Sequence, residues 1–166
     1  MRALITLLLM MTNVCLWAGA VRVIGQPAPE LTIDAIIQAP TGTTITLQAL
    51  HGKAVVLDCW ATWCGPCVEA IPHLNDLVDK TKDQPVQFIA LTSEEPNAVR
   101  AFLEKNPLKA WVAADPDNSV AKDYRIPALP VAFLMDTSGT LRGLMEPGKI
   151  TEDVVKRLID GKPLTP

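Results

Sequence analysis

Two cysteines three residues apart carry the clearest chemistry in the sequence. Cys64 and Cys67 are separated by Gly65 and Pro66 and preceded by Trp63. We expect a helix to begin at about Gly65, which places Cys67 one turn along from Cys64, where the two can form a disulfide. Free amide groups and the positive end of the helix dipole at that point favour the thiolate form of Cys64. The pattern predicts two-step disulfide exchange, in which Cys64 is the nucleophile and Cys67 resolves the mixed disulfide.

Three other interpretations of the pair stay open. A zinc site needs two further ligands, and the chain after residue 20 offers only Cys59, His51 and His73, in no matching spacing. An inert structural disulfide is the second, although a Gly-Pro pair at a helix start is an unusual place for one. The third is a peroxidase that uses Cys64 alone, but such an enzyme has Thr where this chain has Ala61.

The cysteine pair must be positioned by a strand before it and a helix after it. The run from Lys53 to Trp60 is mostly apolar and predicts a central strand buried on both faces. A helix is expected over residues 65–82, with a kink at Pro72. The order of the elements predicts an α/β fold, in which parallel strands joined by helices precede an antiparallel hairpin. The other expected elements are strands at 86–91, 111–113 and 131–135, a hairpin partner at 140–145, helices at 97–105, 117–124 and 151–159, and two short β-like pieces at 31–37 and 43–47.

Asp58 is the most informative polar residue outside the cysteine motif. It lies in the apolar run, where an unpaired carboxylate is costly to bury. Burial would raise its pKa, so that it could take a proton from Cys67 during the second step. The alternative is an exposed aspartate near the end of the strand. Cys59 points to the opposite face of the strand and is expected to be a core residue and not a third redox thiol, while Glu94 and Glu95 are expected to lie in a solvated loop.

The first 20 residues are expected to direct the protein to its location and to take no part in the fold. Arg2 is followed by an uncharged stretch to Val21, and the small residues at 18–20 suit a cleavage site, which predicts a signal peptide cut after Ala20. An uncleaved membrane anchor is the alternative, because the uncharged stretch is just long enough to cross a bilayer. In either case residues 21–166 form one domain that works outside the cytoplasm, where disulfides persist.

Composition supports a single globular domain. The 166 residues are 49% hydrophobic, which is enough for a substantial core and too apolar for a disordered chain. The net charge of −3 excludes the basic surface of a typical nucleic-acid-binding protein. With 14 prolines, the chain is also unsuited to a helical bundle or a coiled coil.

Several segments together resemble one known family. Gly52-Lys53, Val55 to Leu57 and the run from Trp60 to Cys67 are similar to the thioredoxin superfamily, and more narrowly to its exported TlpA/ResA-like thiol–disulfide oxidoreductases. The segments 24–29 and 129–136 resemble further landmarks of that branch. The resemblance implies a thioredoxin-like fold, with a central mixed β-sheet flanked by helices and an extra N-terminal β segment.

The same resemblance implies roles for residues beyond the cysteines. Pro130 matches the proline that follows a cis peptide bond in thioredoxin folds, and Pro127 is the other proline nearby. A cis bond there would place Leu129 beside the cysteines, with its backbone available to pair with an extended substrate segment. Asp58 stands at the position of the buried aspartate of thioredoxins. The other residues expected to contact substrate are Trp63, Gly65 and Pro66.

The function implied by this resemblance is the reduction of protein disulfides outside the cytoplasm, with a membrane protein as electron donor. No cofactor or metal is expected besides the redox-active disulfide. Gly65-Pro66 is the dipeptide of cytosolic thioredoxins, which are strong reductants. Apocytochrome c is one substrate of the branch, but its cytochrome-maturation members often have an acidic residue where this chain has Val131.

Two other functions stay open at this point. One is a dithiol oxidase, and the other is a thioredoxin-like module that binds peptides or a metal with little redox turnover. The protein is expected to be a monomer with no nucleic-acid partner. We expect it in the periplasm or another extracytoplasmic space, or anchored to the outer face of the cytoplasmic membrane.

Overall fold

The computed structural model describes residues 24–33 and 35–164, so the expected signal segment lies outside the described residues. The strands are β1 (Ala35–Gln38), β2 (Ala54–Cys59), β3 (Val86–Thr92), β4 (Trp111–Ala114), β5 (Val131–Met135) and β6 (Leu141–Met145). The helices are α1 (Gly65–Thr81), α2 (Pro96–Leu103), α3 (Ser119–Tyr124), α4 (Glu152–Ile159) and the short 3-10 helix η1 (Pro147–Lys149).

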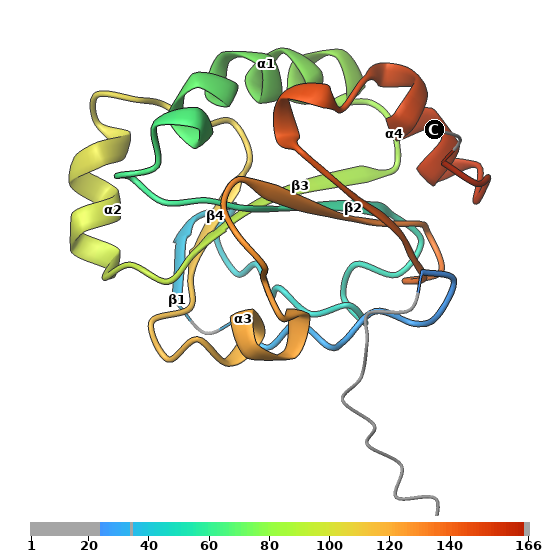
Figure 1. The fold of residues 1–166 in the computed structure, drawn as a ribbon, viewed down its shortest axis with the longest axis horizontal. Helices are drawn as coiled ribbons and strands as arrows, with labels where there is room; N and C mark the ends of the chain where they lie inside the picture. The colour runs from blue at the N-terminus through green and yellow to red at the C-terminus, as the bar shows by residue number, and fades with distance from the viewer. Residues whose placement is uncertain (1–23, 34, 165–166) are drawn as a thin grey trace, which may run out of the picture.

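One mixed sheet joins all six strands in the order β1-β4-β3-β2-β5-β6. The strands β2, β3 and β4 are parallel, while β5 is antiparallel to β2 and β6 is antiparallel to β5. Figure 1 shows α1 and α4 above this sheet and α3 below it. The expected mixed α/β architecture, with parallel strands first and a hairpin last, is confirmed.

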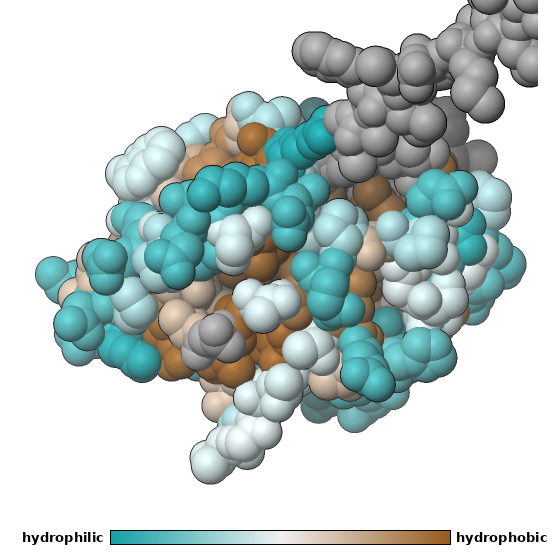
Figure 2. Space-filling view, turned by 90° about the horizontal axis from the view of Figure 1, so that it is seen from below, coloured by the Kyte–Doolittle hydropathy of each residue, from teal (hydrophilic) through white to brown (hydrophobic). Residues whose placement is uncertain are grey.

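Two hydrophobic cores lie on the two faces of the sheet. Val56 of β2, and Trp60 just after its end, pack with residues of α1, α2 and α4 on one face. Leu57 and Cys59 point to the other face, where α3 and the N-terminal segment cover them. All six residues of β2 are therefore buried, as the apolar run predicted. Figure 2 views the molecule from the α3 side and shows apolar residues in hollows between more hydrophilic ones.

The expected N-terminal β segment is present, but its extent differs from the prediction. β1 is confined to Ala35–Gln38 and pairs antiparallel with β4 at the sheet edge, while residues 43–47 form no strand and make only the single bridge Ile33–Ile45. The backbone of this segment binds side chains and a turn carbonyl in place of a strand ladder. The Leu47 amide donates to Glu30 Oε1 at 2.7 Å, and the Thr43 amide donates to the Pro40 carbonyl at 3.1 Å. Bonds of this kind take up amides that a strand ladder would otherwise use.

Helix ends follow capping chemistry. Thr151 caps α4 as expected, since its side chain accepts from the Val154 amide. α3 begins two residues later than predicted because Asp115 provides the cap from a distance. The Asp115 carboxylate accepts from the Ser119 and Ala121 amides, whereas Asn118 makes no capping bond through its side chain.

Candidate active site

Cys64 and Cys67 form a disulfide at the start of α1. Their Cα atoms are 5.2 Å apart. Cys64 is the N-cap residue of the helix, and its Sγ accepts a hydrogen bond from the Cys67 amide at 3.3 Å. Cys64 therefore occupies the helix terminus at which free amides and the helix dipole favour negative charge on sulfur. Both sulfur-bearing residues are buried, at 5% and 4% exposure.

The surface beside the disulfide is made by the residues between and before the cysteines. Trp63 is 75% exposed, which is unusual for so large an apolar side chain. Gly65 and Pro66 are exposed as well. α1 starts with this proline in its first turn and continues through Pro72 to Thr81. The disulfide is thus nearly covered, while the indole beside it is exposed to solvent.

Leu129 and Pro130 lie on either side of a second feature of the site, a cis peptide bond. Leu129 and Trp63 both line a pocket of about 390 Å³. Pro130 and Pro66 both line a smaller pocket of about 190 Å³. The residues predicted to contact substrate are thus brought together around the cysteine pair, although Leu129 and Pro130 are more than sixty residues from it in sequence.

Asp58 is buried, with 7% exposure, and its Oδ1 atom has no hydrogen-bond partner among the described residues. Removal from solvent raises the pKa of this carboxyl to about 7. Its side chain alternates with those of Leu57 and Cys59 and so faces the core that contains Cys64 and Cys67. The exposed alternative considered for Asp58 is wrong.

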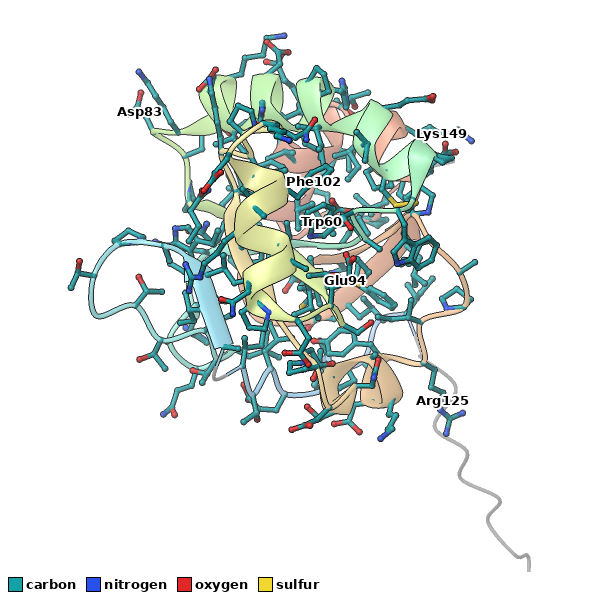
Figure 3. All side chains as sticks on the ribbon, turned by 90° about the vertical axis from the view of Figure 1, so that its left-hand side faces the viewer. Trp60, Asp83, Glu94, Phe102, Arg125 and Lys149 are labelled. Atoms are coloured by element: carbon teal, nitrogen blue, oxygen red, sulfur yellow. A yellow bond between two sulfur atoms is a disulfide. The ribbon has the colours of Figure 1, made fainter. Side chains whose placement is uncertain are left out.

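Cys59 is the last residue of β2, and Trp60 follows it. Cys59 is buried in the core on the opposite face from the disulfide. Trp60 packs against Phe102 of α2, with ring centroids 5.5 Å apart (Figure 3). The two side chains are therefore buried on opposite faces of the sheet at the end of β2.

Glu94 is a site residue that the sequence reasoning missed. We expected it to be solvated, but its carboxylate accepts two hydrogen bonds from Thr62, one from the amide and one from the hydroxyl, each 2.6 Å long. Figure 3 labels Glu94 just below Trp60. The available signal was topological. Glu94 follows β3, which is parallel to β2, and loops after adjacent parallel strands meet at one edge of a sheet.

Neither a metal nor a membrane site is visible in the described part of the chain. No group of three or more His, Cys, Asp or Glu residues there could hold a metal ion. Within the same residues, no helix has the length and apolarity needed to cross a bilayer.

Comparisons with known proteins agree with this geometry. Residues 24–144 match the AhpC/TSA family. The thiol-disulfide oxidoreductase ResA of Bacillus thuringiensis subsp. konkukian is 37% identical over 117 residues, which are 70% of this chain and 65% of that protein. This match thus spans slightly less than two thirds of that relative. The ResA of Geobacillus kaustophilus is 30% identical over 141 residues, covering 84% of this chain and 79% of that protein.

Solved structures show the same fold. A Chlorobium tepidum protein described as a candidate thiol:disulfide interchange protein DsbE superposes with a TM-score of 0.70 at 26% identity, covering 85% of this chain and 98% of that one. A thiol-disulfide isomerase of Corynebacterium glutamicum superposes with a TM-score of 0.66 at 25% identity, covering 81% and 94%. The chain belongs to the AhpC/TSA family and, within it, to the thioredoxin-fold group that includes the ResA thiol-disulfide oxidoreductases.

Proposed function

We propose that this protein is an extracytoplasmic thiol–disulfide oxidoreductase that reduces disulfides in other proteins. The observation that carries the proposal is the Cys64–Cys67 disulfide at the N-terminus of α1, next to the exposed Trp63. The family membership and the names of the relatives support the same reaction class. The active group is the cysteine pair itself, so the reaction needs no further cofactor.

The reaction proceeds in two exchanges. The Cys64 thiolate attacks one sulfur of the substrate disulfide, which forms a mixed disulfide and releases the first substrate thiolate. Cys67 then attacks the Cys64 sulfur, which restores the Cys64–Cys67 disulfide and releases the second substrate thiolate. Two electrons have passed to the substrate. The dithiol must be regenerated by a donor dithiol, and we assign that role to a membrane protein.

Asp58 serves the second exchange as the proton acceptor for Cys67. A thiol is a weak nucleophile until it loses its proton, and a carboxyl with a pKa of about 7 can accept that proton near neutral pH. The position of Asp58 on the disulfide-facing side of β2 supports this role. We infer transfer either directly or through a water molecule.

The substrate lies across the surface formed by Trp63, Gly65, Pro66 and Leu129. An extended segment of the substrate protein pairs with the backbone beside Leu129, as an added strand would. Pro130 sets the direction of that backbone. The pockets that Trp63 shares with Leu129, and Pro66 with Pro130, support contact on both sides of the disulfide. Oxidised apocytochrome c is one protein substrate of this class.

The site of action follows from the N-terminal segment. We propose that residues 1–20 export the protein to the periplasm or an equivalent extracytoplasmic space, with retention as an anchor on the outer face of the membrane as the other arrangement. The mature domain then acts as a monomer. Reduction in an oxidising compartment is the reason that a dedicated electron donor is required.

Insulin reduction tests the activity. Catalytic amounts of the mature protein, residues 21–166, are added to insulin and dithiothreitol, and the turbidity of the released B chain is followed. We expect acceleration by the wild type and none by Cys64→Ser. Cys59→Ala, which removes the thiol on the opposite face of β2, is the matched control and should retain the wild-type rate. A wild type without acceleration, or an active Cys64→Ser, would contradict the proposal.

The reduction potential of the pair tests the direction of electron flow. The potential is measured by equilibrating the mature protein in graded thiol–disulfide buffers. We expect about −250 mV or lower, in the range of thioredoxin, because the Gly65-Pro66 dipeptide is shared with strong reductants. A value near about −120 mV would assign the protein to the strong oxidants and reverse the proposed direction.

A further inference from the structure

The turn that leads from β2 to Cys64 is held by the carboxylate of Glu94, which lies in the loop after β3. We propose that Glu94 is a positioning residue, whose bidentate contact with Thr62 fixes this turn and thereby keeps Cys64 at the helix terminus when the disulfide is open. The inference rests on the proposed exchange reaction for its purpose, but the contact itself is independent of any substrate.

The contact uses both oxygens of the carboxylate. Oε2 accepts from the Thr62 amide at 2.6 Å, and Oε1 accepts from the Thr62 hydroxyl at 2.6 Å. The Thr92 hydroxyl also donates to Oε2 at 3.2 Å and accepts from the Glu94 amide at 3.3 Å. Glu94 and Thr62 are both half-buried. Charge-assisted bonds of this length are stronger than those between neutral groups, so the carboxylate is tightly held.

Thr62 lies inside the turn that places the nucleophile. The last sheet contact before the turn is the bond from the Trp60 amide to the Leu91 carbonyl, at 3.0 Å. The turn closes with the bond from the Cys64 amide to the Ala61 carbonyl, at 3.1 Å. Between these two points the Thr62 amide has no ladder partner, and Glu94 supplies one. The carboxylate therefore continues the β2–β3 connection past the end of the strands.

The reduced enzyme needs this contact more than the oxidised one. In the oxidised state the disulfide ties Cys64 to the first turn of α1. Reduction removes that tie, and the sulfur must remain close to the free helix amides for its thiolate to be favoured. The bonds between Glu94 and Thr62 do not depend on the disulfide, so they hold the turn in both states.

Capping of helix α2 does not explain the contact between Glu94 and Thr62. α2 begins after Glu95, which is its N-cap residue, and the Glu95 side chain makes no capping bond. The side-chain bonds of Glu94 go instead to Thr62 in the preceding loop and to Thr92 at the end of β3. Glu95 is exposed and adjacent to Glu94, so it serves as a matched control with the same charge.

Positioning and charge predict opposite results for Glu94 variants. Loss of a nearby negative charge would favour the Cys64 thiolate and speed its reactions in both Glu94→Ala and Glu94→Gln. Loss of positioning would slow Cys64 in Glu94→Ala only. In Glu94→Gln the amide oxygen can accept from the Thr62 amide, and the amide nitrogen can donate to the Thr62 hydroxyl, so the turn stays held.

The test is the rate at which iodoacetamide alkylates Cys64 in the reduced protein, measured from pH 5 to 9 and assigned by peptide mass. We expect Glu94→Ala to react about tenfold more slowly at pH 7, with the midpoint of its rate–pH profile at higher pH. Glu94→Gln should recover most of the rate, and Glu95→Ala should match the wild type. Faster reaction in both Glu94 variants, or an unchanged profile in Glu94→Ala, would overturn the proposal.

A second variant, Thr62→Val, tests the same contact in case Glu94→Ala fails to fold. Thr62→Val removes only the hydroxyl donor and keeps the hydrogen bond from the Thr62 amide to the carboxylate. We therefore expect the alkylation of Cys64 to slow by about threefold. An unchanged rate–pH profile in Thr62→Val contradicts the proposal even if Glu94→Ala fails to fold. Alkylation needs no substrate protein. A wild type that fails to reduce insulin, yet shows this alkylation pattern, would refute the proposed function and leave the role of Glu94 intact.

Discussion

Two buried aspartates lie near opposite ends of the same strand pair and have opposite surroundings. Asp58 is in β2, close to the disulfide, and is 7% exposed. Asp136 directly follows β5, which is antiparallel to β2, and is 2% exposed. Burial alone disfavours the charge of both carboxylates. What separates them is the number of hydrogen-bond donors that each one meets.

The Asp136 carboxylate accepts four hydrogen bonds. They come from the Ser138 amide at 2.9 Å and hydroxyl at 2.6 Å, from the Thr140 amide at 3.1 Å, and from Arg142 Nε at 2.6 Å. Burial acts to raise the pKa of Asp136, but the bonds from Ser138, Thr140 and Arg142 outweigh it, and the pKa is lowered. Asp136 therefore stays charged and organises the turn between β5 and β6.

Asp58 has the opposite balance. No hydrogen-bond partner for its Oδ1 lies in the described part of the chain, and removal from solvent raises its pKa to about 7. The comparison teaches that burial by itself does not define a carboxylate's role. A buried carboxylate with a full set of donors stabilises the fold, whereas one without them is poised to exchange a proton at neutral pH.

The largest expected effect is on the stability of the oxidised protein after Asp58→Ala. The folded-state pKa of about 7 lies above the unfolded value, so the wild type loses stability as pH rises from about 4 to 7. The variant lacks this loss. We expect its free energy of unfolding, measured in urea, to exceed that of the wild type by about 3 kcal/mol at pH 8. At pH 4 the gain should vanish, and a loss of stability at both pH values would break the contrast.

Asp136→Ala should lower the free energy of unfolding, whereas Asp58→Ala should raise it. Removal of the carboxylate leaves Arg142, whose side chain is only 29% exposed, and the donors of Ser138 without their partner. We expect a loss of about 2–3 kcal/mol at pH 7 in the same urea experiment. Because its pKa is depressed, Asp136 contributes stability above the unfolded pKa and loses that contribution as pH falls through the folded value. The free energies of unfolding of the wild type and Asp136→Ala should therefore become similar in acid.

The control for Asp136 is an ion pair at the surface. Asp153 is 70% exposed and pairs with Arg157 at 2.7 Å. Asp153→Ala should cost less than about 0.5 kcal/mol, because water solvates both partners once they separate. Equal losses in Asp136→Ala and Asp153→Ala would show that the donors around Asp136 contribute nothing beyond an ordinary surface pair.

The sequence was sufficient to predict features that depend on residues close together in the chain. Asp58 stands alone among apolar residues within one strand, and this predicted its burial and its raised pKa. The cysteine spacing predicted the start of α1 and the disulfide, and alternation along β2 predicted that Cys59 faces away from them. In each case the informative residues lie within one turn or one strand of each other.

Contacts between distant segments were not predictable in this way. Glu94 and Thr62 are 32 residues apart, and the polar character of Glu94 suggested only exposure. The segment 43–47 has the composition of a strand, but the Glu30 carboxylate takes the Leu47 amide that a ladder would need. A polar side chain that satisfies backbone groups elsewhere in the fold leaves no periodic signal in its own sequence.

After the stability changes expected for Asp58→Ala and Asp136→Ala, the smallest effect is on the rate of the second exchange. It tests whether the lack of hydrogen-bond donors to Asp58 contributes to the reaction. The mixed disulfide of Cys64 with 5-thio-2-nitrobenzoate is prepared, and release of the coloured thiol reports the attack of Cys67. We expect Asp58→Ala to slow this release about tenfold at pH 7.5. Asp136→Asn, studied below its unfolding temperature, should release the thiol at the wild-type rate.

The pH dependence identifies the cause of this slowing. Below pH 7 Asp58 is protonated and cannot accept the Cys67 proton, so the wild type and Asp58→Ala should react at similar rates. As pH rises through about 7 the carboxylate forms and the rates should separate. At higher pH Cys67 ionises without help, and the difference should shrink again. A constant ratio of the two rates across this range would mean that Asp58 affects the geometry of the pair, and that its unpaired carboxylate has no part in moving the proton.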